Sequence, residues 1–360
     1  MKAAGVIVEF NPLHDGHIEH LRETTRITGR EHIIAVMSGN FVQRGEPAIV
    51  DKWQRTRMAL HAGVDIVIEL PVAYVISGAE DFAQGAVRLL AATGIVDRLC
   101  FGSECGDIKP IIEAGRILAY ETNEYKKNLA QGLSCGLSFA AARSTALAQA
   151  IETNLDGLLT KPNNGLGIEY CKALWQLGWP MEASTSYRRA GGPSATAIRK
   201  TMLVSSDKSE FAHLNNFSQI FRYMIFTTNP DLGEGLENRF RHYAREHSQL
   251  TDILDAVKTK RYTYTRLQRA ALGVILGITK PNKDKTPPYI RVLGFKREKA
   301  NLLGELARNA NLPVITHNKS AAQLDTRGKS MLEKEHEASD IYNLAQGNNK
   351  NERNLPLVII

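Results

Sequence analysis

Two histidines separated by a glycine follow the first apolar run of the sequence. The run Val6–Phe10 ends at Pro12, and His14, Gly16 and His17 then form a His-x-Gly-His tetrad directly before a helical stretch. By average residue frequencies such a tetrad occurs by chance in on the order of one chain in a hundred. Glycine lets the backbone pass close to a bound group, and a helix N-terminus offers unpaired N–H groups and a positive dipole end. This strand-to-helix turn is therefore suited to binding phosphate.

His14 and His17 are the candidate catalytic residues. Two imidazoles beside an anion site can donate hydrogen bonds to the α-phosphate of a nucleotide and to the leaving pyrophosphate, as charge develops in the transition state. The alternative is that both histidines only form the turn and cap the helix. That alternative would be stronger if the tetrad lay in the middle of a helix or in an isolated loop.

A second candidate phosphate site begins at Ser194, after a glycine-proline turn. The hydroxyls of Ser194 and Thr196 in the first helical turn, with Arg199 one turn later, could clamp a pyrophosphate. The segment alone is weak, because Ser and Thr are common helix N-caps and Arg199 could simply be solvated. It gains weight beside the histidine tetrad, since both would flank one nucleotide.

Short apolar runs alternate with helical segments over the first 200 residues. The runs are β-branched and continuous, as expected of parallel strands that are covered on both faces. This alternation predicts a doubly wound α/β sheet, whose ligands bind beyond the carboxyl ends of the strands. The expected strands are 6–10, 33–37, 64–70, 96–101 and 181–188, and the expected helices are 51–62, 78–92, 110–120, 133–154 and 168–177, with a loop at 161–165.

The loop after the second strand should border the pocket. Asn40 and Gln43 could hydrogen-bond an acyl group or a ribose, and Arg44 could neutralise a carboxylate. Ser38 is small enough for an acetate pocket and equally suited to a tight turn. A surface lid without ligand contact is the alternative for this loop.

Two later strand ends supply further candidates. Gly102 ends the fourth strand, where a glycine would let adenine lie against the backbone; packing against a helix is the alternative. Arg188 and Arg189 follow the strand 181–188 and could contact a phosphate or RNA, or be an exposed pair without function.

The second half of the chain differs in pattern. We place a domain boundary between residues 204 and 205, at a polar stretch. Residues 210–276 are mainly helical, and residues 289–345 form a small strand-helix-strand-helix tail that could fold back onto the first part. Residues 347–354 look mobile.

The excess of positive over negative charge lies entirely in that second half. Lys and Arg number 21 in residues 1–200, equal to Asp and Glu, whereas residues 201–360 hold 24 against 17. This excess fits a polyanionic partner such as RNA, although a merely soluble basic surface explains it equally well.

One segment of the second half interleaves basic and aromatic residues. Lys258, Lys260, Arg261 and Arg266 could bind phosphates while the neighbouring tyrosines stack on splayed bases. A solvated helix start is the alternative.

Composition limits the remaining classes. No apolar run approaches the roughly 20 residues of a membrane span, and no signal-peptide core precedes the first strand. We therefore expect a cytoplasmic protein with no membrane and no DNA partner. The four cysteines show no zinc-ligand spacing, so we expect no protein-built metal site and read them as reduced, partly buried residues.

These motifs carry a resemblance. The tetrad and the Ser194–Arg199 helix start resemble the two signatures of the nucleotidyltransferase superfamily, which includes class I aminoacyl-tRNA synthetases and cofactor adenylyltransferases. Further segments are similar to the bacterial tRNA(Met) cytidine acetate ligase family, and the resemblance covers essentially the whole chain. Those segments are Val8–Pro12, Met37–Ala48, Phe101–Glu104, Pro162–Tyr170 and Pro288–Gly294.

The resemblance implies a fold and two domains. Residues 1–204 would form a Rossmann-like, ATP-binding nucleotidyltransferase domain of α/β class. Residues 205–360 would form a mainly helical, basic tRNA-binding region with a small α/β tail.

The resemblance also implies an activity. Such an enzyme activates acetate with ATP to acetyl-adenylate and transfers the acetyl group to the N4 amine of the wobble cytidine of elongator tRNA(Met). ATP is the substrate, and Mg²⁺ would be carried by its phosphates. The implied ATP-binding residues are Ile7, Val8, Glu9, Phe10, Asn11, Pro12, Leu13, His14, Asp15, Gly16, His17, Ile18, Glu19, His20, Gly102, Asn163 and Arg188, with Asn164 nearby.

The sequence departs from the family pattern in two ways. Leu13 and Asp15 stand where the resemblance leads us to expect Phe and Asn. The chain has no Lys-Met-Ser-Lys-Ser loop of the synthetase kind, so that role would pass to Arg188, Arg189 or Arg199. Two other functions stay open: an adenylyltransferase with a small phosphate acceptor, and a non-catalytic RNA-binding protein that keeps a relic nucleotide fold.

Overall fold

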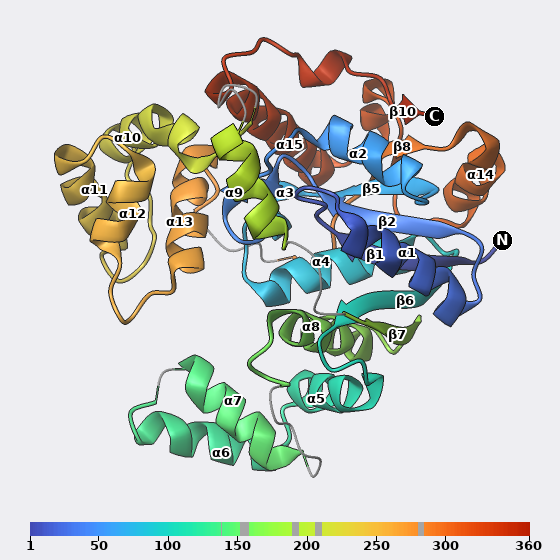
Figure 1. Cartoon of the computed structure of the whole chain (residues 1–360), viewed down its shortest axis with the longest axis horizontal. Helices are drawn as coiled ribbons and strands as arrows, with labels where there is room; N and C mark the ends of the chain where they lie inside the picture. The colour runs from blue at the N-terminus through green and yellow to red at the C-terminus, as the bar shows by residue number, and fades with distance from the viewer. Residues whose placement is uncertain (138, 152–157, 189–193, 206–210, 280–283) are drawn as a thin grey trace.

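The computed structural model describes residues 1–137, 139–151, 158–188, 194–205, 211–279 and 284–360 (Figure 1). Within these ranges an eight-stranded sheet forms the centre of an α/β part, and a group of helices stands beside it. The strands of the sheet are β1 (Ala3–Val8), β2 (Ile33–Ser38), β5 (Ile66–Leu70), β6 (Val96–Ser103), β7 (Glu182–Tyr187), β8 (Ile290–Phe295), β9 (Val314–Ile315) and β10 (Val358–Ile359).

Five of these strands are parallel and lie in the order β5-β2-β1-β6-β7. The chain runs from β1 outward to β2 and β5, then returns to the other side of β1 with β6 and β7. The strand order therefore reverses between β1 and β6, and an open α/β sheet binds its ligand at such a point, beyond the carboxyl ends. The expected doubly wound sheet is confirmed.

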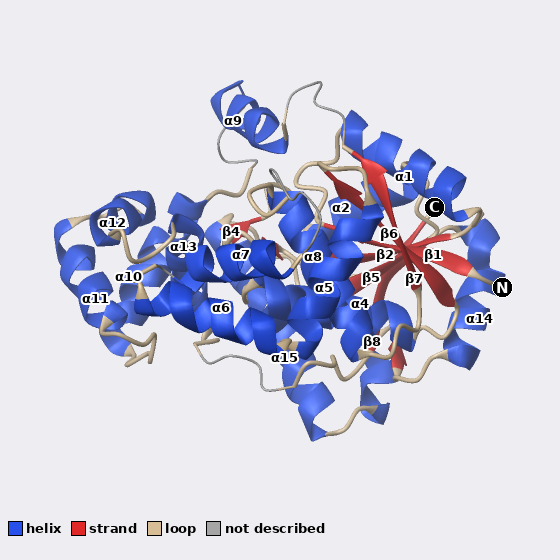
Figure 2. Ribbon diagram, turned by 90° about the horizontal axis from the view of Figure 1, so that it is seen from below, coloured by secondary structure: helices blue, strands red, loops and turns tan. Residues whose placement is uncertain are grey.

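Alternation along the strands gives the sheet two apolar faces, and Figure 2 shows helices on both sides of the strands. In β2, Ile34 and Val36 enter one core, and Ile33, Ala35 and Met37 enter the other, because successive side chains point to opposite faces. Helices α1 (Asp15–Thr28) and α2 (Lys52–His61) cover the second face. The first face is covered mainly by α4 (Ala79–Ala92), α5 (Ile108–Tyr120), α8 (Pro162–Gln176) and α14 (Ala300–Asn309).

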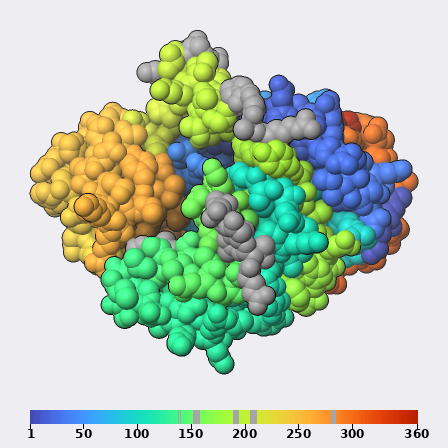
Figure 3. Space-filling view, turned by 60° about the horizontal axis from the view of Figure 1, so that its bottom comes forward, coloured from blue at the N-terminus to red at the C-terminus, as the bar shows by residue number. Residues whose placement is uncertain are grey.

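A second apolar core lies in the helical part, which forms the lobe at the left of Figure 3. Its helices are α10 (Ser218–Thr227), α11 (Leu236–Glu246), α12 (Leu250–Val257) and α13 (Tyr264–Leu276). The other described elements are β3 (Phe41–Val42), β4 (Glu46–Pro47), α3 (Val72–Val75), α6 (Asn123–Ser134), α7 (Phe139–Ala150), α9 (Ala195–Ser205), α15 (Thr326–Ala345), and the 3-10 turns η2 (Leu214–Phe217), η3 (Arg297–Lys299), η4 (Asn318–Gln323) and η5 (Glu352–Asn354).

The C-terminal tail completes the sheet of the first part. β8 pairs antiparallel with β5, while β9 and β10 pair with β8. The tail therefore folds back as the sequence suggested it could. The boundary between residues 204 and 205 stays a prediction. The expectation that residues 347–354 are mobile is wrong for Glu352, which is 2% exposed.

No helix in the described ranges is long and apolar enough to cross a bilayer. All four cysteines are free. Cys100 and Cys171 are buried, but Cys105 and Cys135 are exposed, which corrects the expectation of partial burial for these two.

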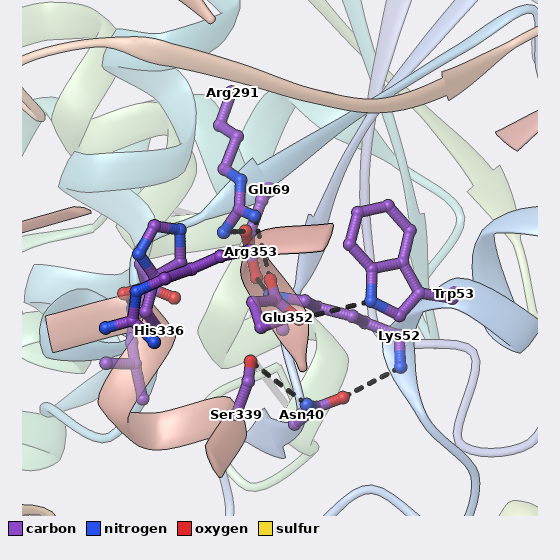
Figure 4. Close-up of polar contacts among 12 residues, drawn as sticks. Asn40, Lys52, Trp53, Glu69, Arg291, His336, Ser339, Glu352 and Arg353 are labelled. Carbon is purple, nitrogen blue, oxygen red and sulfur yellow. Dashed lines mark hydrogen bonds and ion pairs between the residues drawn. The ribbon is translucent and has the colours of Figure 1, made fainter. Parts of the chain in front are cut away.

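Glu352 belongs to a buried ion-pair cluster that joins the tail to the sheet (Figure 4). Lys52 of α2 lies 2.6 Å from the carboxylates of both Glu69 and Glu352, and Arg291 of β8 lies 2.8 Å from the same two carboxylates. Burial and the nearby Glu69 raise the pKa of Glu335 to about 8. With Glu335 protonated at neutral pH, two cations face two anions. Charge balance therefore holds the C-terminal segment against α2.

Glu352→Ala should destabilise the fold by about 3 kcal/mol or more, because removing one partner leaves the buried Lys52 and Arg291 facing only one ionised carboxylate. Urea unfolding followed by circular dichroism measures the change. Glu298→Ala is the matched control, since Glu298 is exposed and forms no ion pair in the described chain. Equal unfolding midpoints for the two variants would contradict the assigned role of the cluster.

Candidate active site

The histidine tetrad lies where β1 passes into α1. Phe10 takes a left-handed conformation (φ 46°), which bulky residues rarely adopt, and its ring packs edge-on against His17 with centroids 5.2 Å apart. His14 precedes α1 in an extended conformation, and its Nδ1 accepts a hydrogen bond from the Gly16 N–H at 3.1 Å. The capping role left open by the sequence is therefore real, but it uses only one ring nitrogen.

Two other ring nitrogens of the tetrad lack a partner in the described part of the chain. The His14 and His17 rings stack with centroids 3.8 Å apart. His14 Nε2 and His17 Nδ1 are buried and have no hydrogen-bond partner among the described residues. Buried polar atoms are nearly always hydrogen-bonded in native proteins, so these two nitrogens indicate a polar ligand.

Both imidazoles are neutral at pH 7. Burial lowers the pKa of His14, and the positive charge of Arg188 lowers it further. Burial, His14 and Arg188 lower the pKa of His17 to about 3. Because Nδ1 of His14 accepts a hydrogen bond, the proton of the neutral ring is on Nε2, which is then a donor.

The rest of the segment 7–20 frames this pair. Ile7 and Val8 end β1, and the buried Asn11 accepts a hydrogen bond from the Ile49 N–H at 2.7 Å. The half-buried carboxylate of Glu9 accepts a hydrogen bond from the Gln43 N–H at 2.6 Å, and burial raises the pKa of this carboxyl group. The remaining members are Pro12, Leu13, Asp15, Ile18, Glu19 and His20.

His20 connects this helix to the far strand of the site. Its Nδ1 lies 2.7 Å from the Ser186 hydroxyl of β7, and burial lowers its pKa to about 4. Ser186 is in turn paired with Gly102 of β6. The tetrad helix is therefore tied to the strands across the switch point.

Gly102 offers an open face at that point. A Cβ built on Gly102 meets no described atom within 4 Å, although β6 lies between β1 and β7 in the sheet. Among the alternatives for this residue, helix packing is therefore excluded in the described chain. An adenine ring has room to lie against the strand.

Asn163 is placed beside β6 by a carboxylate. The loop expected at 161–165 is wrong, because α8 begins at Pro162 and places Asn163 and Asn164 in its first turn. Glu104 accepts hydrogen bonds from both backbone N–H groups and from the Asn163 side chain at 2.7–3.2 Å, and Asn164 accepts from the Glu104 N–H at 2.8 Å. The N-terminus of α8 is therefore already capped by the Glu104 carboxylate.

The loop after β2 is held by side-chain hydrogen bonds. Asn40 is 6% exposed; its side-chain oxygen accepts from the Lys52 N–H at 2.8 Å, and its amide donates to Ser339 at 3.3 Å (Figure 4). The Asn40 side chain therefore joins this loop to α2 and α15, and its contact with a ligand stays a prediction. Ser38 is 1% exposed, and its hydroxyl has no partner among the described residues.

The second predicted phosphate segment reaches the tetrad through its arginine. Ser194 caps α9 by accepting from the Ala197 N–H at 3.2 Å. Arg199 donates to the Asn11 carbonyl at 2.8 Å and to the exposed Thr196 at 3.3 Å, and it pairs with Glu46 at 3.5 Å. Arg188 is exposed at the end of β7, and Arg189 lies outside the described residues.

Comparison with known proteins shows the family to which the chain belongs. The family model described as HIGH Nucleotidyl Transferase matches residues 1–355. The chain is 39% identical to the tRNA(Met) cytidine acetate ligase of Caldanaerobacter subterraneus subsp. tengcongensis, over 97% of this chain and 96% of that protein. It is 40% identical to the Caldicellulosiruptor saccharolyticus ligase of the same name, over 96% and 94% of the two chains. The chain belongs to the tRNA(Met) cytidine acetate ligase family.

A solved structure supports the same conclusion. Thermotoga maritima TmcAL bound with alpha-thio ATP matches this chain with a TM-score of 0.92 and 32% identity, over 100% of each chain. The resemblance inferred from the motifs is therefore confirmed, and this protein is an ATP-dependent ligase.

The four residues predicted to contact tRNA lie together on the helical part, but two are already paired. Arg261 and Arg266 lie 3.0 and 3.9 Å from the Glu234 carboxylate, while Lys258 and Lys260 are exposed. The expectation that Tyr262 stacks on bases is wrong: it is 5% exposed, and its hydroxyl donates to Glu234.

Sequence reasoning missed Arg55, whose guanidinium binds backbone carbonyl oxygens of the loops that form the site. This α2 residue is 0% exposed and donates to the carbonyl oxygens of Glu9 (2.7 Å), Ser38 (3.1 Å), Gly39 and Val50 (3.2 Å). An arginine in a helical segment ordinarily indicates a solvated face, so the sequence carried no signal for it.

Gly102→Val should weaken ATP binding at least tenfold, because the new side chain occupies the open face of β6. Folding should hardly change, since an added Cβ meets no described atom. Isothermal titration calorimetry with ATP measures the affinity. Gly304→Val in α14 is the control, because its Cβ also meets no described atom. ATP affinity equal to the wild type in Gly102→Val would place the adenine elsewhere.

Proposed function

We propose that this ligase activates acetate with ATP, forming acetyl-adenylate and pyrophosphate. We further propose that it transfers the acetyl group to the N4 amine of the wobble cytidine of elongator tRNA(Met). The observation that carries the proposal is the pair of unpartnered imidazole nitrogens at the start of α1, beside the switch point of the sheet. The names of the relatives supply the acetate and the tRNA.

In the first step an acetate oxygen attacks the α-phosphorus of ATP. A new O–P bond forms, the bond to the β-phosphate oxygen breaks, and pyrophosphate leaves with its electron pair. His14 and His17 donate hydrogen bonds to the oxygens on which charge accumulates, which stabilises the transition state. Their neutral rings donate without first having to gain a proton.

In the second step the N4 amine attacks the acetyl carbonyl. The N–C bond forms, the C–O bond to AMP breaks, and the amine loses one proton. No general base is assigned, because an amine on an activated acyl-adenylate can react without one.

In this proposal Arg188 binds the phosphates of ATP, the role that the Lys-Met-Ser-Lys-Ser loop has in synthetases. It is exposed and close enough to lower the pKa of both histidines by its charge. Arg199 is engaged with Asn11 and Glu46, so it positions the tetrad loop rather than the nucleotide.

The proposal also covers the cofactor and the compartment. The described residues include no group of three His, Cys, Asp or Glu that could hold a metal ion. We therefore place Mg²⁺ on the ATP phosphates, where it would neutralise charge. The enzyme would act in the cytoplasm, on tRNA.

Pyrophosphate exchange tests the function directly. Radioactive pyrophosphate should enter ATP only when acetate is present, because the first step is reversible. Exchange without acetate but with a phosphate monoester would identify an adenylyltransferase. No exchange under any condition, with tRNA binding intact, would identify a non-catalytic RNA-binding protein.

His14→Ala and His17→Ala should each lower acetate-dependent pyrophosphate exchange by about a hundredfold or more, the usual loss when one transition-state donor is removed. Circular dichroism should show unchanged folding. Unaltered exchange in both variants would refute the catalytic assignment.

Replacing Lys258, Lys260, Arg261 and Arg266 together by alanine should weaken tRNA binding and flatten its salt dependence by up to about four units of slope. Because Arg261 and Arg266 pair with Glu234, they contribute less to the salt slope than two unpaired cations would. Filter binding at several salt concentrations measures the slope, and pyrophosphate exchange should survive. An unchanged affinity and slope would mean that this patch is only solvated.

A further inference from the structure

Helix α10 carries two exposed aromatic side chains one turn apart. Tyr223 is 66% exposed and Phe226 is 41% exposed, whereas Phe221 and Ile225 of the same helix are buried in the helical core. Residues three apart lie on one face of a helix, so the two rings are neighbours. A group of exposed aromatic rings indicates an interaction surface.

Two arginines of α11 border these rings. The Arg245 guanidinium lies 5.8 Å from the centre of the Phe226 ring. Arg241 donates to the carbonyl oxygens of Ile225 at 3.1 Å and Thr228 at 3.2 Å, which fixes it at the end of α10.

The charges of these arginines are not neutralised within the described chain. Neither Arg241 nor Arg245 forms an ion pair there, in contrast to Arg261 and Arg266. The acids of α11 do not change this, because Glu246 contacts His242 at 3.4 Å and Glu237 forms no ion pair among the described residues. The face therefore presents positive charge that no described carboxylate contacts at ion-pair distance, with Arg241 fixed by neutral oxygen acceptors.

A small cavity opens beside this face. It has a volume of about 210 Å³ and lies between the end of α10 and the end of α13, where Thr228, Asn229 and Gly277 are among its lining residues. Arg241 contacts Thr228 and Asn229, two of the residues that line this cavity.

We propose that Tyr223, Phe226, Arg241 and Arg245, named here the stacking face, bind unpaired bases of the tRNA substrate. Aromatic rings and guanidinium planes are the groups on which splayed RNA bases stack, and unneutralised arginines favour a polyanion over an apolar protein partner. The proposal rests on the proposed function and adds to it the place where single-stranded RNA is held.

This role differs in its physics from that of residues 258–266. Contacts with phosphates release counterions and therefore depend on salt, whereas stacking of a base on a ring does not. In Figure 1 the helices α10 and α11 lie on the side of the molecule away from α14 and the N-terminus.

The test compares Tyr223→Ala/Phe226→Ala with Tyr223→Phe/Phe226→Tyr. The alanine variant should bind an unmodified elongator tRNA(Met) transcript about ten- to a hundredfold more weakly, because each stacked base contributes about 1–3 kcal/mol. Its salt slope should not change. The ring-preserving variant should bind as the wild type does. Both should keep acetate-dependent pyrophosphate exchange and should bind a fully paired RNA duplex equally well.

Tyr120→Ala is the matched control, since Tyr120 is 59% exposed on α5 and should not affect tRNA binding. Wild-type tRNA affinity in the alanine variant would overturn the inference, as would an equal loss for the paired duplex. A change in the oligomeric state of the free protein, with tRNA binding unaltered, would instead identify a protein interface. Failure of the proposed function is seen separately, as absence of acetate-dependent exchange in the wild type.

Discussion

The active site depends on one fully buried arginine. Arg55 holds the carbonyl oxygens of Glu9, Ser38 and Gly39, which are the points where β1 and β2 give way to their loops. An unpaired buried charge is very costly, and burial indeed lowers the pKa of Arg55, so the helix can keep it there only while several acceptors surround it. The tetrad loop and the loop after β2 therefore have to leave the sheet around α2 in a fixed arrangement.

The first turn of α2 also connects these two loops to the C-terminal segment that contains Glu352. Lys52, one turn before Arg55, is balanced by Glu69 and Glu352, and its backbone N–H donates to Asn40. A Cβ on Gly39 would come within 2.7 Å of the Glu69 carboxylate, so the glycine is needed for the loop to approach the cluster. The C-terminal segment thus supports a loop more than 300 residues away in sequence.

The helical part is joined to the site through the short hairpin β3–β4. Glu46 of β4 accepts from Gln268 of α13 at 3.1 Å and pairs with Arg199 of α9, which in turn donates to Asn11. Gly45 lies so close to the α13 backbone that a Cβ would be 2.5 Å from the Arg269 nitrogen. RNA held on the helical part would therefore be positioned by rigid contacts relative to the tetrad.

Sequence patterns predicted most of the sheet and the strand-to-helix turn that carries the tetrad, because apolar runs and the histidine tetrad are local signals. They did not predict the ion-pair cluster, since Lys52, Glu69, Arg291 and Glu352 each resemble solvated charges until the fold brings them together. The start of α8 was missed because Pro162 was read as part of a loop, although proline is favoured in the first turn of a helix. Tyr262 was misjudged because burial is set by tertiary packing.

In the proposed mechanism, capping and catalysis by His14 are not alternatives. By accepting the Gly16 N–H, its Nδ1 closes the first turn of α1, and this bond leaves the proton of the neutral ring on Nε2. Nε2 is the atom that lacks a partner among the described residues. Stacking on His17 then limits rotation of the ring. The capping bond therefore orients the donor before a phosphate arrives, and such preorganisation is what makes a hydrogen bond effective in a transition state.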